Sequence, residues 1–133
     1  MAEAGISAPA EGRVKISDDY LQAHKSTNNS SADIDIERLT PVAAFVYTQV
    51  PATGRNGRFE PRGVSVDGAV DSDDNPDFTA TSGIINGWYK NDPDSPGRAN
   101  LMTERFTCGI THPCRFKKIR PYETTARGII IKA

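Results

Sequence analysis

The residues best suited to covalent chemistry lie in the segment TCGITHPCRF, where Cys108 and Cys114 flank His112. A thiol beside an imidazole is the pair that a cysteine hydrolase uses, provided that a third group orients the imidazole. The Gly-x-Ser-x-Gly turn of the serine hydrolases does not occur in the sequence. The other histidine, His24, belongs to a polar stretch near the N-terminus. We therefore expect His112 to be a turn residue and predict that the chain is not an enzyme.

The same two cysteines bear on metal binding and redox state. Their C-x5-C spacing matches no common zinc module, which needs about four ligands. A short hairpin through the intervening residues would bring Cys108 and Cys114 opposite each other, which permits a disulfide. A reducing compartment favours free thiols instead. We favour free thiols, leave the disulfide open, and expect neither a metal nor a cofactor.

An acidic stretch, DSDDNPDF, has part of a calcium-loop pattern. Asp71, Asp73 and Asn75 stand at the first, third and fifth places of an EF-hand loop, which ends in a bidentate Glu. Pro76 occupies the place of the turn glycine, and Ser82 stands where the Glu is needed. The pattern favours a solvated Asp/Asn/Pro turn over a calcium site.

Two further groups are candidates for partner binding. Arg55, Arg58 and Arg62 belong to GRNGRFEPRG, which lacks both common phosphate-loop motifs and is typical of a hairpin loop or of a contact with an anionic partner. Trp88 and Tyr89 are neighbours in NGWYK, so on a strand they point to opposite faces. We expect Trp88 to be a core residue, and an exposed aromatic here would suit a protein interface or a sugar.

The elements that must position these residues are short strands. From residue 34 onward apolar residues recur at every second position, with turn signals between the runs. This pattern predicts an all-β antiparallel sandwich or jelly roll of about seven to eight short strands. A small barrel is the variant of this prediction. Residues 41–50 are apolar on both faces, which is typical of one buried strand, and an Asp-Gly step at 67–68 signals a turn. Within each predicted strand, a group of residues is expected to lie on one face. The groups are Ile34 and Ile36; Val64 and Val66; Phe78, Ala80, Ser82 and Ile84; Met102, Phe106 and Cys108; Cys114, Phe116 and Lys118; Ile129 and Ile131.

Residues 1–33 differ from the rest because they are polar and lack a sustained period. This predicts two parts, an N-terminal arm over 1–33 and a β-sandwich domain over 34–133, since such a stretch buries little surface to offset the entropy of ordering. A helix of about two turns with Ser17 as its N-cap is expected within the arm.

Charge is balanced over the whole chain but not along it. The net charge is −1, while residues 60–99 carry eight acidic and three basic side chains and residues 100–133 carry seven basic and two acidic ones. We favour mutual compensation of the two segments, and the alternative is that opposite poles help neighbouring copies dock. The basic and aromatic run CRFKKIRPY is more typical of a half-buried strand than of a nucleic-acid site, because the sequence pI is about 6.1.

The N-terminus lacks the basic start and apolar stretch of a signal peptide, and no window reaches the about 18 apolar residues of a membrane span. We therefore expect a protein made in a cytoplasm, with no membrane partner.

In chain length, in the arm over 1–33 and in the β-rich body over 34–133, the chain resembles the small accessory proteins that decorate or cement the heads of tailed phages. The resemblance implies a non-enzymatic structural protein of a virion, a homo-oligomer that binds a larger capsid-like assembly. An arm suits this role because strand addition needs few specific side chains. The alternative is a lectin-like, carbohydrate-binding β-sandwich that uses the Asp71–Asp77 loop, with or without calcium, and Trp88 or Tyr89 as a sugar platform.

Overall fold

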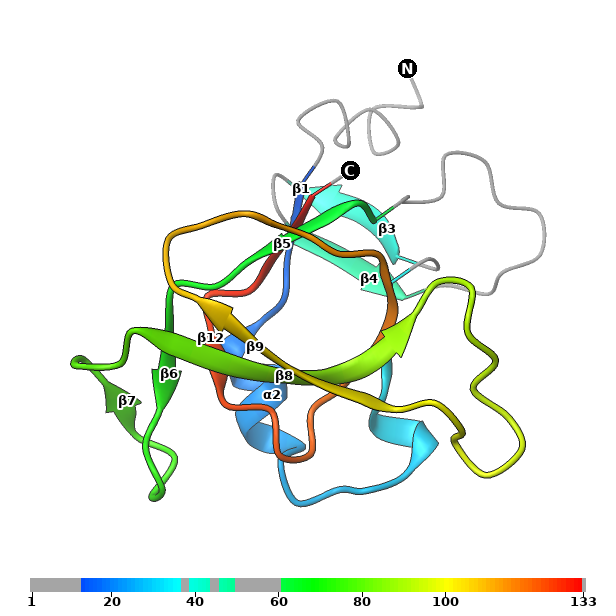
Figure 1. Ribbon diagram of the computed structural model, residues 1–133, viewed down its shortest axis with the longest axis horizontal. Coiled ribbons are helices and arrows are strands. Elements are labelled where there is room, and N and C mark those ends of the chain that lie inside the picture. Colours follow the sequence, from blue (N-terminus) through cyan, green and yellow to red (C-terminus); the bar gives the residue numbers. More distant parts are fainter. Residues whose placement is uncertain (1–12, 37–38, 44–45, 50–60, 133) are drawn as a thin grey trace.

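The computed structural model describes residues 13–36, 39–43, 46–49 and 61–132, with backbone alone for 39–43 and 46–49. Within these residues the secondary structure is mostly strands, which pair only antiparallel, so the predicted all-β class is confirmed (Figure 1). The finer prediction of a jelly roll stays a prediction.

The described strands form three sheets and a separate hairpin. The first sheet orders β1 (Arg13–Lys15), β13 (Ile130–Lys132), β5 (Gly63–Ser65) and β10 (His112–Pro113). The second orders β2 (Ile34–Asp35), β11 (Phe116–Arg120), β8 (Ser82–Tyr89) and β9 (Met102–Thr107). The third orders β12 (Ala126–Arg127), β6 (Gly68–Val70) and β7 (Pro76–Asp77), and the hairpin joins β3 (Leu39–Ala43) to β4 (Val46–Gln49).

The described residues hold thirteen strands, not the seven or eight predicted. The excess arises because many strands are only two or three residues long, and because the apolar run 41–50 divides between β3 and β4 instead of forming one strand. The Asp67-Gly68 step does not close a hairpin. It carries the chain from β5 in the first sheet to β6 in the third.

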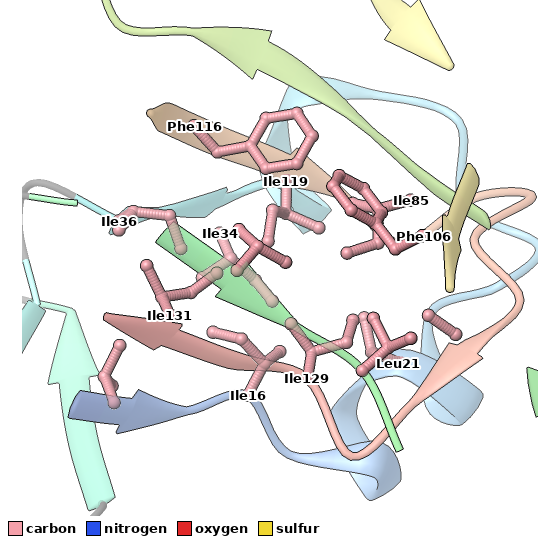
Figure 2. Packing of buried hydrophobic residues seen from close by; sticks show 14 residues of the cluster. Ile16, Leu21, Ile34, Ile36, Ile85, Phe106, Phe116, Ile119, Ile129 and Ile131 are labelled. Atoms are coloured by element: carbon pink, nitrogen blue, oxygen red, sulfur yellow. The ribbon is translucent and has the colours of Figure 1, made fainter. Parts of the chain in front are cut away.

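One core lies between the sheets. Alternate residues of the strands point into it, as expected for Ile34 and Ile36 and for Ile129 and Ile131, all of which are buried (Figure 2). The cluster consists of Val14, Ile16, Leu21, Ile34, Ile36, Val64, Val66, Ile85, Phe106, Phe116, Ile119, Ala126, Ile129 and Ile131.

Three of these core residues lie in the stretch predicted to be an arm. Val14, Ile16 and Leu21 are 1%, 4% and 2% exposed, and β1 pairs with β13, beside which it lies in Figure 1. The predicted arm is therefore wrong for residues 13–33, because their few apolar side chains complete the core. Residues 1–12 lie outside the described residues, so the arm is not tested there.

The helix expected in this stretch is present. α2 (Asp18–Ala23) begins after Ser17, whose hydroxyl accepts a hydrogen bond from the Tyr20 N–H at 3.2 Å. The carboxylate of Asp18 accepts the Gly128 N–H at 3.0 Å, which ties the helix to the start of the last strand. A short 3₁₀ helix, η2 (Ser30–Ala32), then leads into β2. A helix of this length is marginal alone, and it is held here by tertiary contacts.

Candidate partner-binding site

Trp88 is a core residue and not a contact for a partner. It is 1% exposed, and its ring N–H donates to the carbonyl of Ala99 at 3.0 Å. The guanidinium of Arg98 lies 4.8 Å from the ring centroid and donates to both carboxylate oxygens of Asp33, at 2.6 and 3.0 Å. Trp88 thereby anchors the loop that follows β8. The candidate role in partner binding is wrong for Trp88, and the expected core role is confirmed.

Tyr89 is half-buried and engaged within its own domain. Its hydroxyl donates to a carboxylate oxygen of Glu104 at 2.5 Å, and its ring lies 5.5 Å from that of Phe116. Burial, followed by the hydrogen bond to Glu104, raises the pKa of Tyr89 above its usual value. With its hydroxyl bonded to Glu104 and its ring against Phe116, Tyr89 is poorly placed to stack on a sugar.

The two cysteines and His112 do not form a nucleophile and base pair in the structure. Both cysteines are free thiols. The Nε2 atom of His112 accepts the backbone N–H of Thr107 at 3.1 Å, and its ring meets Phe106 edge-on at 5.1 Å. This bond occupies the lone pair that a general base would use. His112 lies on β10 (His112–Pro113), which pairs with β5, so the expectation that it is a turn residue is wrong.

Burial, and then the nearby Glu104 carboxylate, raises the pKa of the Cys114 thiol from 9.0 to about 12. The folded state therefore favours the protonated thiol, and the stability that this contributes is complete below pH 9 and declines as the pH rises toward 12.

We expect iodoacetamide to alkylate Cys114 at pH 9 roughly a hundredfold more slowly in the folded chain than in the urea-unfolded chain, because the thiolate is the reacting form. The alkylation rate is measured in a Cys108→Ser variant, in which Cys114 is the one cysteine that can react. Equal rates in the two states would contradict the raised pKa.

Of the three candidate arginines, only Arg62 lies in the described part of the chain. Arg55 and Arg58 lie outside it. Arg62 is exposed, and its backbone N–H donates to the carbonyl of Lys132 at 2.7 Å. This bond continues the β13–β5 ladder, so Arg62 lies at the rim of the first sheet.

The outer surface of this sheet is basic. Val14, Ile131 and Val64 lie in register and point into the core, so their neighbours point outward. The outward side chains include Arg13 opposite Lys132, and Lys15 opposite Ile130. We name Arg13, Lys15 and Lys132 the cationic face; Arg62 lies outside it, because it alternates with the core residue Val64. Periodicity alone could not reveal it, because its members come from distant parts of the chain.

The acidic stretch 71–77 forms the ordered turn that follows β6, over residues 71–75, and then β7 itself. One carboxylate oxygen of Asp71 accepts the N–H groups of Asp73 and Asn75, at 2.9 and 3.0 Å. One oxygen of Asp77 accepts the N–H and the hydroxyl of Thr79, at 3.0 and 2.7 Å, and these bonds lower the pKa of Asp77. The described residues hold no group of three or more His, Cys, Asp or Glu placed to bind a metal ion. The turn orders itself through its own backbone.

Phe78 follows β7 and is 89% exposed, and Ile110 is 53% exposed. They are the exposed large hydrophobic residues of the described chain. Their two loops lie side by side, since the Cys108 N–H donates to the carbonyl of Thr81 at 2.9 Å. We name Asp71, Asp73, Asp77 and Phe78 the acidic tip.

The sequence did not predict that Phe78 would be exposed, because alternation through Ile84 placed it on a strand face. That prediction is wrong, since β8 begins only at Ser82. The signal that points to the turn is Asp77 two residues before Thr79, a spacing at which a carboxylate bonds its own backbone.

The acidic and basic segments compensate each other in part. Lys117 and Lys118 both reach the carboxylate of Asp94, at 3.5 and 2.5 Å. Adjacent residues of a regular strand point to opposite faces. Lys117 and Lys118 reach the same carboxylate because the strand register shifts between Phe116 and Lys118. The shift also breaks the predicted face of Cys114, Phe116 and Lys118, since it is Ile119 that joins Phe116 in the core.

Comparison with family models, with curated proteins and with solved structures gave no match to this chain. Among the described residues, no helix has the length and apolar character needed to cross a membrane.

Proposed function

We propose that the chain is a non-enzymatic assembly protein that binds copies of itself, within a larger protein array, through the acidic tip. The observation that carries the proposal is Phe78, which is 89% exposed although the chain on both sides of it is ordered by backbone N–H groups that donate to the carboxylates of Asp71 and Asp77. Burying a Phe side chain contributes about 1.5–3 kcal/mol. An aromatic anchor on an ordered turn binds without a large loss of conformational entropy.

The charge around Phe78 supports a protein as the partner. Asp71, Asp73 and Asp77 precede it in the chain and have no cationic side chain within ion-pair distance in the described chain, whereas Asp74 of the same turn pairs with Lys25 at 3.5 Å. Carboxylates repel phosphate groups, so an anionic membrane and a nucleic acid are both disfavoured at this tip. A basic protein surface with an apolar centre fits it.

A virion is the setting of this proposal, with the chain decorating or cementing a capsid. Chain length and the β-rich body support that setting, while the described part of the predicted arm does not. The residues named for the lectin alternative are engaged within the domain. Trp88 is buried, the Tyr89 hydroxyl donates to Glu104, and the Asp71 carboxylate accepts from the backbone of its own turn. We do not propose it.

We expect Phe78→Ser to abolish self-association while leaving the fold intact. The wild-type chain is expected to sediment above the monomer mass as its concentration rises, and the variant to remain a monomer, because a central aromatic anchor supplies a large share of interface energy. Sedimentation velocity over a concentration series measures both.

Thr79→Ala is the control for the geometry of the turn. It removes the hydroxyl bond to Asp77 but leaves Phe78 in place, so weaker association is expected, without complete loss. Self-association of Phe78→Ser equal to that of the wild type would contradict the proposal. So would a wild-type chain that stays a monomer throughout.

A further inference from the structure

We infer that Arg120 anchors a binding site for a small carboxylate from outside the chain, and that Glu123 is an internal carboxylate which this ligand displaces. Arg120 ends β11 and is 8% exposed. Its Nε atom is buried and has no hydrogen-bond partner among the described residues. A buried N–H group without an acceptor is unfavourable, which indicates that a further acceptor binds there. The inference does not depend on self-association through the acidic tip.

The two ends of the Arg120 guanidinium differ in how well they are bonded. The Nη1 atom donates to the side-chain carbonyl oxygen of Asn28 at 3.1 Å. The Nη2 atom lies on the same side of the group as the Nε–H, and it donates to a carboxylate oxygen of Glu123 at 3.3 Å. The Nη2 and Nε groups together form an edge on which arginine binds a carboxylate through two parallel bonds. Within the described chain, Glu123 accepts only one of these two bonds.

The Glu123 carboxylate is a weak partner for this edge. Its side chain is 66% exposed, while that of Arg120 is 10% exposed. An ion pair to an exposed side chain contributes little stability, because water screens it and the side chain loses conformational freedom. A ligand carboxylate that accepts from both N–H groups forms two charge-assisted bonds and displaces one long bond. Movement of the Glu123 side chain opens the edge to that ligand.

Arg98 shows how the same domain completes an arginine internally. Its two terminal nitrogens donate to both oxygens of the Asp33 carboxylate, at 2.6 and 3.0 Å, and the Asp33 side chain is only 5% exposed. Arg120 is the more buried of the two arginines, yet the carboxylate beside it is the exposed one. Burial of a charge is unfavourable without a well-bonded counter-ion. The contrast points to a counter-ion that the domain does not supply.

The surroundings of Arg120 favour a flat anion that approaches the edge of the guanidinium. The ring of Tyr122 lies 5.1 Å from the guanidinium carbon and covers one face of the group. The Lys25 ammonium donates to the carbonyl of Thr124, in the turn after β11, at 2.6 Å and is shared with Asp74 at 3.5 Å. This second cation adds positive charge at the same turn. A carboxylate is planar and matches the open edge in shape and charge.

Acetate is the probe, and the side-chain Nε–H signal of Arg120 in a ¹H–¹⁵N spectrum is the measurement. We expect this signal to shift saturably as sodium acetate is added, with a Kd on the order of millimolar for so small a ligand. Sodium chloride at the same ionic strength is expected to leave it in place. The Nε–H signal of Arg98 serves as an internal reference that does not shift with acetate, because Asp33 already neutralises that arginine.

Two variants separate displacement of Glu123 from a general effect of charge. Glu123→Gln removes the competing carboxylate and is expected to bind acetate about two- to fivefold more tightly, which is the contribution of an exposed ion pair. Asp19→Asn removes an exposed carboxylate on α2 and is expected to bind acetate like the wild type. An Arg120 signal that shifts with protein concentration but not with acetate would assign the carboxylate to a second copy of the chain.

The inference fails if the Arg120 signal responds neither to acetate nor to protein concentration, because a bound water then fills the edge. It also fails if Glu123→Gln binds acetate no more tightly than the wild type, since Glu123 is then not displaced. Neither result bears on the acidic tip, which is tested separately by Phe78→Ser.

Discussion

A chain shortened to residues 34–133 is expected to lose its cooperative fold. The truncation removes β1, which pairs with β13, and it removes the buried side chains of Val14, Ile16 and Leu21. Each such side chain contributes about 1.5–3 kcal/mol by burial, and a domain is stable by only about 5–15 kcal/mol. Circular dichroism during a thermal melt is expected to show a sigmoidal transition for the full chain and none for 34–133.

A pair of point variants in α2 makes the same test without a truncation. Leu21 is 2% exposed and Gln22 is exposed. Leu21→Ala is expected to lower the free energy of unfolding by about 2–5 kcal/mol, and Gln22→Ala to change it by less than about 0.5 kcal/mol. If the shortened chain melts like the full chain, residues 13–33 are a dispensable arm and the described fold is wrong there.

The second large effect is expected at Gly87, at the centre of β8. A Cβ added there would lie 2.5 Å from the carbonyl oxygen of Lys118 and 3.0 Å from two ring carbons of Phe116. The first is backbone of the paired strand and the second is a fully buried ring, so neither moves without disturbing the core. Gly87→Ala is therefore expected to cost about 3 kcal/mol or more in urea unfolding.

Gly68 on β6 provides the matched control. An added Cβ there meets only the guanidinium end of Arg127, at 3.7 Å, which is an ordinary contact with a flexible side chain. Gly68→Ala is expected to change stability by less than about 1 kcal/mol, since alanine also reduces the entropy of the unfolded chain. Equal losses in the two variants would show that the close packing of β8 on β11 is not as described.

The sequence predicts much of the core because burial leaves a local pattern. Ile129 and Ile131 lie two positions apart in a run of three isoleucines, and Ser17 precedes two acidic residues as a helix cap does. These signals depend on residues close together in the chain. The all-β class follows from many such short runs.

The remainder depends on contacts between distant residues, which a single sequence does not display. Val14 and Ile131 lie at opposite ends of the chain, so nothing in the N-terminal stretch alone indicates that it joins a sheet. The cationic face has the same origin, since Arg13 and Lys132 become opposite neighbours only through this pairing. Phe78 was misplaced because the hydrogen bonds of a turn overrode an apparent period of two.

The claim that joins these results is that the domain assembles through its acidic tip. A dilution series of ¹H–¹⁵N spectra of the wild-type chain tests it at single residues. We predict that the amide signals that shift on dilution include those of residues 71–78 and 108–111. Spectra that do not change on dilution, or shifts confined to other strands such as β9, would contradict it.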